Sequence, residues 1–176
     1  LFVDENLIYE PDLEMYGQKA LIDTKNYYQN LNIAFSKIEK WTGKEIIICC
    51  SGKYIYKDNL FDSRKIYYGK TLELIQHSYL VIAQASTCIY QAILDYKPIL
   101  RLDDDNFISN QLLVQKHFDQ LKFINCINTK NLTKNNFFKS FKVKYDQYEN
   151  FIRNNIGDSK LGDNYIDVFT EELKRI

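Results

Sequence analysis

Short apolar runs separated by helical segments constrain the fold of this chain more than any other feature. Three of them, "EIIICC" from Glu45 to Cys50, "YLVIAQ" from Tyr79 to Gln84 and "KPILRL" from Lys97 to Leu102, show little polar alternation. Continuous apolar runs are typical of strands that helices cover on both faces. Strands that alternate with helices form right-handed βαβ units with parallel strands. The sequence therefore predicts an α/β fold: a Rossmann-like, three-layer domain with a mostly parallel sheet and helices on both faces.

The rest of the chain supplies further elements of this pattern. A helix is predicted from the spacing of apolar residues between Tyr28 and Trp41, and Gly43 is placed to end it. "RKIYYG" (64–69) reads as an edge strand, and Thr71 is expected to cap the helix that follows it. The remaining expected strands cover 1–3 and 123–128, and the remaining expected helices cover 86–96, 110–122, 145–157 and "NYIDVFTEELKRI" near the C-terminus.

Charge and cysteine content argue against several classes of partner. The 23 basic and 23 acidic residues balance, so neither nucleic acid nor an anionic membrane is an expected partner. No apolar run reaches the roughly 18 residues of a transmembrane helix. The four cysteines form no CxxC motif, so we expect buried free thiols in a reducing cytoplasm and neither disulfides nor a zinc site. The chain begins with Leu1 instead of Met, which suggests a part of a longer protein.

Polar clusters follow the predicted strands at the points where the strands end. They are Asp4-Glu5-Asn6, Ser51-Gly52-Lys53, Ser86-Thr87 and Asp103-Asp104-Asp105. Ligands of parallel α/β sheets bind beyond the carboxyl ends of the strands. We therefore expect these four clusters to converge at one edge of the sheet. The three aspartates also suggest an Asp-x-Asp metal site, but a solvated acidic loop is the commoner origin of such a run, and no metal is predicted.

Ser86 and Thr87 stand where an apolar strand gives way to a predicted helix. A helix N-terminus has unpaired N–H groups and a partial positive charge, so it can bind a phosphate. One hydroxyl suffices to cap the helix, and the second is then available to a ligand. The residues alone leave capping and phosphate binding open, with capping the commoner role.

The stretch "YGKTLELIQHSYLVIAQASTCIYQAILDYKPIL" (68–100) resembles the donor-binding half of GT-B glycosyltransferases that build bacterial surface polysaccharides, capsules and lipooligosaccharides, the sialyltransferases among them. The opening "FVDENLIYEPDLEMYG" is similar to the Asp-rich loop that starts this half, and the likeness covers roughly 1–125. The residues of the dense stretch that match the family pattern are Thr71, Glu73, Leu74, Ile75, Ser86, Thr87, Ala92, Lys97 and Pro98.

The resemblance implies a nucleotide-sugar donor as substrate, with no cofactor and no metal. Ser86 and Thr87 would bind the donor phosphate. The residues implied to contact the nucleotide or sugar are Asp4, Glu5, Ser51, Gly52, Lys53, Tyr68, Gly69, Lys70 and Gln84. Ser51-Gly52 replaces the His-Pro motif of related sialyltransferases, so Lys53 or Lys70 would supply the missing positive charge.

The resemblance also implies an organisation for the whole protein. Residues 1–125 would form the nucleotide-sugar-binding core, and 126–176 a mainly helical extension of the same domain. A glycan or lipid-linked acceptor would bind an N-terminal half outside this sequence, so the catalytic residues stay unassigned and this part alone is expected to be inactive. The parent enzyme would be cytoplasmic, peripheral at the inner membrane. A non-catalytic GT-B-like interaction module and one half of a sugar-nucleotide 2-epimerase are the alternatives.

Overall fold

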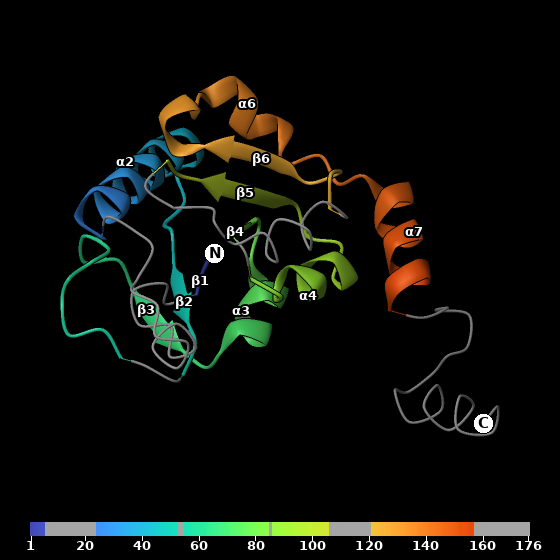
Figure 1. The fold of residues 1–176 in the computed structure, drawn as a ribbon, viewed down its shortest axis with the longest axis horizontal. Coiled ribbons are helices and arrows are strands. Elements are labelled where there is room, and N and C mark those ends of the chain that lie inside the picture. The colour runs from blue at the N-terminus through green and yellow to red at the C-terminus, as the bar shows by residue number, and fades with distance from the viewer. Residues whose placement is uncertain (6–23, 53–54, 85, 106–120, 157–176) are drawn as a thin grey trace. The chain divides into compact units, whose positions relative to one another are not determined.

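A computed structural model of the chain describes residues 1–5, 24–52, 55–84, 86–105 and 121–156 (Figure 1). The chain divides into two compact units, Leu1–Val143 and Lys144–Ile176. The first unit holds the whole sheet. The second contains α7 (Tyr145–Asn155). The helices predicted over 110–122 and at the C-terminus lie mostly or wholly outside the described residues.

The described residues form one parallel sheet of six strands in the order β3-β2-β1-β4-β5-β6. This is the strand order typical of dinucleotide-binding Rossmann folds, so the predicted fold class is confirmed. The central strand β1 lies between β2 and β4, and its Phe2 is in register with both Ile48 and Ile82. The strands are β1 (Phe2–Asp4), β2 (Ile48–Cys50), β3 (Ile66–Tyr68), β4 (Val81–Ala83), β5 (Ile99–Asp103) and β6 (Asn125–Asn128).

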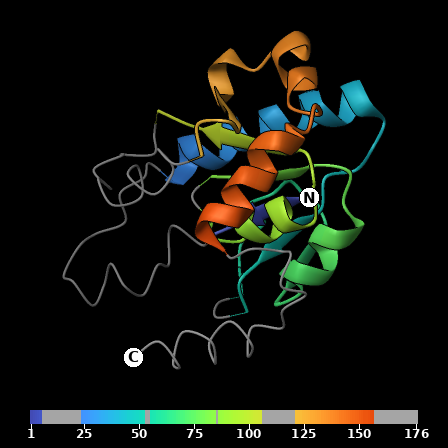
Figure 2. The same cartoon turned by 90° about the vertical axis from the view of Figure 1, so that its right-hand side faces the viewer.

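Helices cover both faces of the sheet. Figures 1 and 2 show α2 (Thr24–Thr42) and α6 (Lys134–Lys139) on one side and α3 (Thr71–His77) and α4 (Ile89–Leu94) on the other. A short 3₁₀ turn, η1 (Thr129–Asn131), connects β6 to α6. The core on the α2 side includes the buried side chains of Phe2, Phe35, Ile48, Ile82 and Phe137. Because successive strand residues point to opposite faces, Val3 and Cys49 are buried on the α3 and α4 side.

The helix α2 follows from the apolar spacing that predicted it. Leu31, Phe35 and Ile38 are all buried. The helix begins before Tyr28 and ends where expected, at Gly43. That glycine has φ +66°, and its N–H donates to the Glu39 carbonyl at 2.8 Å. A left-handed residue is favourable for glycine because it carries no Cβ.

Two predicted helix starts are wrong. α3 begins at Thr71 itself, with Lys70 in the N-cap position, and the Thr71 hydroxyl lies 3.3 Å from the Cys49 sulfur. That contact across the helix–sheet interface replaces the expected local cap. α4 begins at Ile89 and not at Ser86, because the Ser86 carbonyl and hydroxyl shape a turn before the helix.

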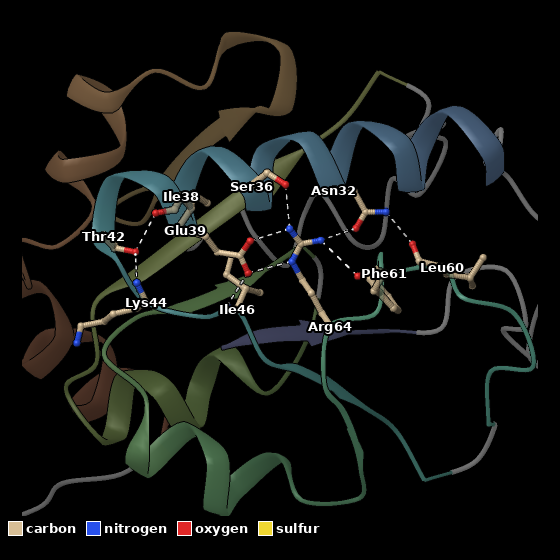
Figure 3. Close-up of polar contacts among 10 residues, drawn as sticks. All are labelled: Asn32, Ser36, Ile38, Glu39, Thr42, Lys44, Ile46, Leu60, Phe61 and Arg64. Carbon is tan, nitrogen blue, oxygen red and sulfur yellow. Dashed lines mark hydrogen bonds and ion pairs between the residues drawn. The ribbon is translucent and has the colours of Figure 1, made fainter.

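An arginine with a mostly buried side chain, Arg64, attaches α2 to the segments before β2 and β3 (Figure 3). Arg64 donates to both carboxylate oxygens of Glu39, from Nε at 3.0 Å and from Nη2 at 2.8 Å. Its other N–H groups donate to Asn32, Ser36 and the Phe61 carbonyl. All five guanidinium N–H donors therefore have acceptors. Glu39 also accepts from the Ile46 N–H at 3.0 Å, which fixes the approach to β2.

The four cysteines are free thiols. Cys49 and Cys50 are buried, as expected, but Cys88 is half-buried and Cys126 is exposed. Cys126 lies on β6, the last strand in the order of the described sheet. Within the described ranges, the longest helices are too short or too polar to cross a bilayer.

Candidate functional site

The carboxyl edge of the sheet contains the point where the strand order reverses. The chain passes from β1 outward to β2 and β3, and then crosses to β4 on the other side of β1. In open α/β sheets such a reversal leaves a crevice beyond the strand ends, where ligands bind. Asp4 ends β1, and Gln84 directly follows β4. Since Phe2 is in register with Ile82, Asp4 and Gln84 occupy equivalent positions on the two strands.

Asp4 is the centre of a buried polar cluster. Its side chain is only 3% exposed. The Tyr56 hydroxyl donates to Asp4 Oδ2 at 2.5 Å, and the Cys50 thiol lies 3.6 Å from the same oxygen. The Tyr56 and Tyr28 hydroxyls are 3.3 Å apart. Burial, and then the Asp4 charge, raise the pKa of both the Tyr56 hydroxyl and the Cys50 thiol well above their ordinary values. Both groups therefore stay protonated and donate to the carboxylate.

Gln84 belongs to the same side of the sheet. Its side-chain oxygen accepts a short hydrogen bond from the Tyr27 hydroxyl, and its backbone carbonyl accepts from Arg101 Nε at 3.2 Å. Tyr27 is fully buried on α2. Burial, then the charges of Asp4 and Glu5, raise the pKa of Tyr27 well above its ordinary value. Tyr27 is therefore a hydrogen-bond donor at any physiological pH.

Ser86 and Thr87 differ in what their hydroxyls do. The Ser86 hydroxyl accepts from the Cys88 N–H at 3.2 Å, and the Ser86 carbonyl accepts from the Ile89 N–H at 3.1 Å. Ser86 is half-buried, whereas Thr87 is exposed. One hydroxyl thus closes the turn before α4, and the Thr87 side chain faces outward where a ligand could reach it.

The ends of β2 and β3 bring two further predicted clusters together. The Gly69 N–H donates to the Cys50 carbonyl at 3.1 Å, and a Cβ built on Gly52 would lie 3.8 Å from Gly69 Cα. Ser51-Gly52 and Gly69-Lys70 are therefore adjacent, with Gly52, Gly69 and Lys70 exposed. Tyr68 is half-buried, and its hydroxyl accepts from the Tyr56 N–H at 3.2 Å. Lys53 lies outside the described residues.

Of the three aspartates, Asp103 is the last residue of β5, and Asp104 and Asp105 bond to neighbouring segments. Asp104 is 2% exposed and accepts from Asn30 at 3.0 Å and from the Thr129 hydroxyl. Asp105 pairs with Lys130 at 2.7 Å and accepts from Asn128. Among the described residues, no three His, Cys, Asp or Glu side chains are grouped closely enough to hold a metal ion.

Sequence reasoning missed the aromatic part of this site. The Tyr27 hydroxyl donates to Gln84, 57 residues away in the sequence, and the Tyr56 hydroxyl donates to Asp4, 52 residues away. Tyr28 contacts both of these tyrosines. In the sequence, Tyr27 and Tyr28 differ in no way from other aromatic residues on the apolar face of a helix. Contacts between residues so far apart in the sequence can be recognised only in the folded structure.

A separate cavity lies at the opposite, amino edge of the sheet. It has a volume of about 400 Å³ and is lined mostly by apolar side chains, including Ile38, Leu74, Leu80 and Phe137. Lys44 lies at its rim, with Nζ 3.8 Å from the centre of the Tyr79 ring. Such a lining does not suit a charged nucleotide, and the cavity contains none of the carboxyl-edge residues.

Comparisons of the chain with known protein families, with curated proteins and with solved structures found no match. The function must therefore be argued from the site itself.

Proposed function

We propose that this chain binds a nucleotide sugar at the carboxyl edge of its sheet, as the donor-binding part of a bacterial surface-polysaccharide or lipooligosaccharide glycosyltransferase. The observation that carries the proposal is the reversal of strand order between β1 and β4, with polar side chains at both strand ends. Ligands containing nucleotides bind at such reversals in open α/β sheets. The resemblance of 68–100 to GT-B donor-binding halves supports the sugar nucleotide as the ligand.

The exposed groups at this edge suit the anionic part of the donor. Thr87 has an exposed hydroxyl next to the turn that leads into α4, and Lys70 is an exposed cation beyond β3. A hydroxyl and an ammonium can both donate to phosphate oxygens, and such charge-assisted bonds are stronger than neutral ones. The donor phosphate is therefore assigned to Thr87 and Ser86, with Lys70 to balance its charge.

The buried carboxylate of Asp4 suits the uncharged part of the nucleotide-sugar donor. Asp4 repels a phosphate but can accept from hydroxyl groups of a ribose or sugar, and Glu5 follows it in the chain. The half-buried Tyr68 ring offers a face on which a base could stack. In the parent enzyme this part would hold the donor while the acceptor and a catalytic base come from elsewhere in the protein.

A panel of CMP, UDP, GDP and their sugars, followed by thermal unfolding, tests the proposal. A ligand at 100 times its Kd stabilises a protein by about 2.7 kcal/mol. For a domain of this size that raises Tm by roughly 5–11 °C. Thr87→Val should raise Kd by about 10- to 100-fold, because it removes one hydrogen bond to a charged group.

Charge variants provide the control for this experiment. Lys70→Gln should weaken nucleotide binding, whereas Lys40→Gln, an equal charge change on the exposed surface near the C-terminal end of α2, should leave it unchanged. A protein whose Tm does not respond to any of the nucleotides would contradict the proposal and favour the non-catalytic interaction module. One observation favours the interaction module: Asp4 already accepts hydrogen bonds from Tyr56 and Cys50.

A further inference from the structure

The side-chain amide of Gln84 has one polar atom that the fold leaves unused. Gln84 is 5% exposed, and its Oε1 accepts from the Tyr27 hydroxyl. Its Nε2 is buried and has no hydrogen-bond partner among the residues that the structure describes. A buried amide nitrogen without an acceptor destabilises the folded state, and native proteins contain few such groups. The position therefore needs an explanation other than stability.

The place of this amide points to a ligand. Gln84 lies directly after β4, at the reversal of strand order, and it precedes Ser86 by two residues. An amide nitrogen only donates, so its partner must be an acceptor. In the structure the Tyr27 hydroxyl contacts Oε1, and Nε2 lies on the other side of the amide.

The charges around the amide restrict the kind of acceptor. Asp4 occupies the equivalent position on β1, Glu5 is the next residue, and both carboxylates act on Tyr27. Two negative charges disfavour a phosphate at this point. A neutral oxygen, such as a sugar or ribose hydroxyl or a base carbonyl, carries no such penalty. The phosphate of the ligand would then bind at Ser86 and Thr87.

We propose that Gln84 donates from Nε2 to a neutral oxygen of the bound nucleotide sugar, and that Tyr27 is the positioning residue that orients the amide for this bond. The inference rests on the proposed function and adds to it an orientation of the ligand. The neutral part of the donor lies against Asp4 and Gln84 on the α2 side, and the phosphate lies towards α4.

A double variant separates this role from a structural one. Tyr27→Phe with Gln84→Met replaces the hydrogen-bonded pair by apolar groups of similar shape, which is often neutral or stabilising when no further partner is lost. The unliganded double variant should therefore unfold at the same Tm as the wild type or a higher one. Its Kd for CMP, UDP or GDP, whichever binds the wild type in calorimetry, should rise about tenfold.

Inorganic pyrophosphate is the second probe, because it carries the charge without the neutral part. The double variant should bind pyrophosphate as the wild type does, whereas Thr87→Val should weaken both pyrophosphate and nucleotide. Tyr27→Phe alone should weaken the nucleotide several-fold and leave pyrophosphate unchanged. A Tyr79→Phe variant, which removes an exposed hydroxyl beside the cavity at the opposite, amino edge, should change neither Kd.

The outcomes distinguish the two proposals. A wild type that binds none of the nucleotides ends the proposed function and this inference with it. A wild type that binds while the double variant binds equally well overturns the inference alone. So does a double variant with a lowered Tm, because the amide would then have a structural partner, or one that loses pyrophosphate and nucleotide equally.

Discussion

Replacing Arg64 tests whether the network in Figure 3 holds α2 against the sheet. The Arg64 and Glu39 side chains are 9% and 28% exposed, respectively. Removing one partner of a buried ion pair costs about 3–5 kcal/mol, because the other charge stays uncompensated. Glu39 keeps some contact with water, so we expect about 3 kcal/mol for Arg64→Ala and a Tm lower by roughly 6–12 °C. Arg64→Lys keeps the charge but loses the bidentate hydrogen bonding to Glu39, and should lower the free energy of unfolding by about 1–2 kcal/mol.

The pH dependence gives this prediction a sign. Burial alone would raise the pKa of Glu39, but the hydrogen bonds from Arg64 and the Ile46 N–H outweigh it and lower that pKa below its ordinary 4.5. The folded state therefore favours the ionised carboxylate. The stability from this group is complete above pH 4.5 and is lost as the pH falls through the folded-state pKa. Urea unfolding of wild type and Arg64→Ala should differ most near pH 7 and least near pH 3.

The neighbouring residue provides a matched control. Lys65 pairs with Glu45 at 2.9 Å, but both side chains are mostly exposed, and exposed pairs contribute little. Lys65→Gln should leave the urea midpoint unchanged. If Arg64→Lys were as stable as the wild type, or if a double-mutant cycle of Arg64→Ala with Glu39→Gln gave no coupling, the network would be no stronger than a surface pair and the reasoning would fail.

Three further predictions concern single sites. Tyr56 has a raised pKa, caused first by burial and then by Asp4. The stability that comes from its protonated hydroxyl is therefore complete below pH 10. Above pH 10 the free energy of unfolding falls by about 1.4 kcal/mol per pH unit. Urea titrations from pH 8 to 11 should show a shallower decline for Tyr56→Phe than for the wild type. Thr133→Ala breaks the capping box with Asn136 at the start of α6 and should lower stability by about 1 kcal/mol, with Thr133→Ser near the wild type by calorimetry. Gly43→Ala places a Cβ at φ +66° and should lower Tm by a few degrees. Gly43→Asn should lower Tm by less, because asparagine tolerates the left-handed conformation better than alanine.

The fold could be predicted from the sequence because its signals are local. The apolar runs at Ile48, Val81 and Ile99 became strands, and the spacing from Leu31 to Ile38 became the buried face of α2. The order of the strands could not be predicted, because it depends on pairing such as Phe2 with Ile82. No local pattern specifies which of the parallel neighbours lies beside β1.

The site was predictable to a smaller extent. The strand ends predicted that Asp4, Ser51 and Ser86 lie at one edge, which the parallel pairing of the sheet confirms. Gln84 and Gly69 are suggested only by the resemblance. The start of α4 was misplaced, because a hydroxyl at a strand–helix junction can close a turn as Ser86 does or cap a helix. Contacts that join distant segments, such as Thr71 with Cys49, depend on the packed structure and could not be read from neighbouring residues.

The central place of β1 has a consequence for synthesis on the ribosome. Its partner residue Ile82 follows Phe2 by 80 positions, and translation at roughly 5–20 residues per second needs about 4–16 seconds to cover that distance. During this interval one side of β1 presents unpaired peptide groups to the crowded cell. Unpaired strand edges can pair with other nascent chains. The protein should therefore aggregate more during overexpression in cells than during refolding at low concentration after purification.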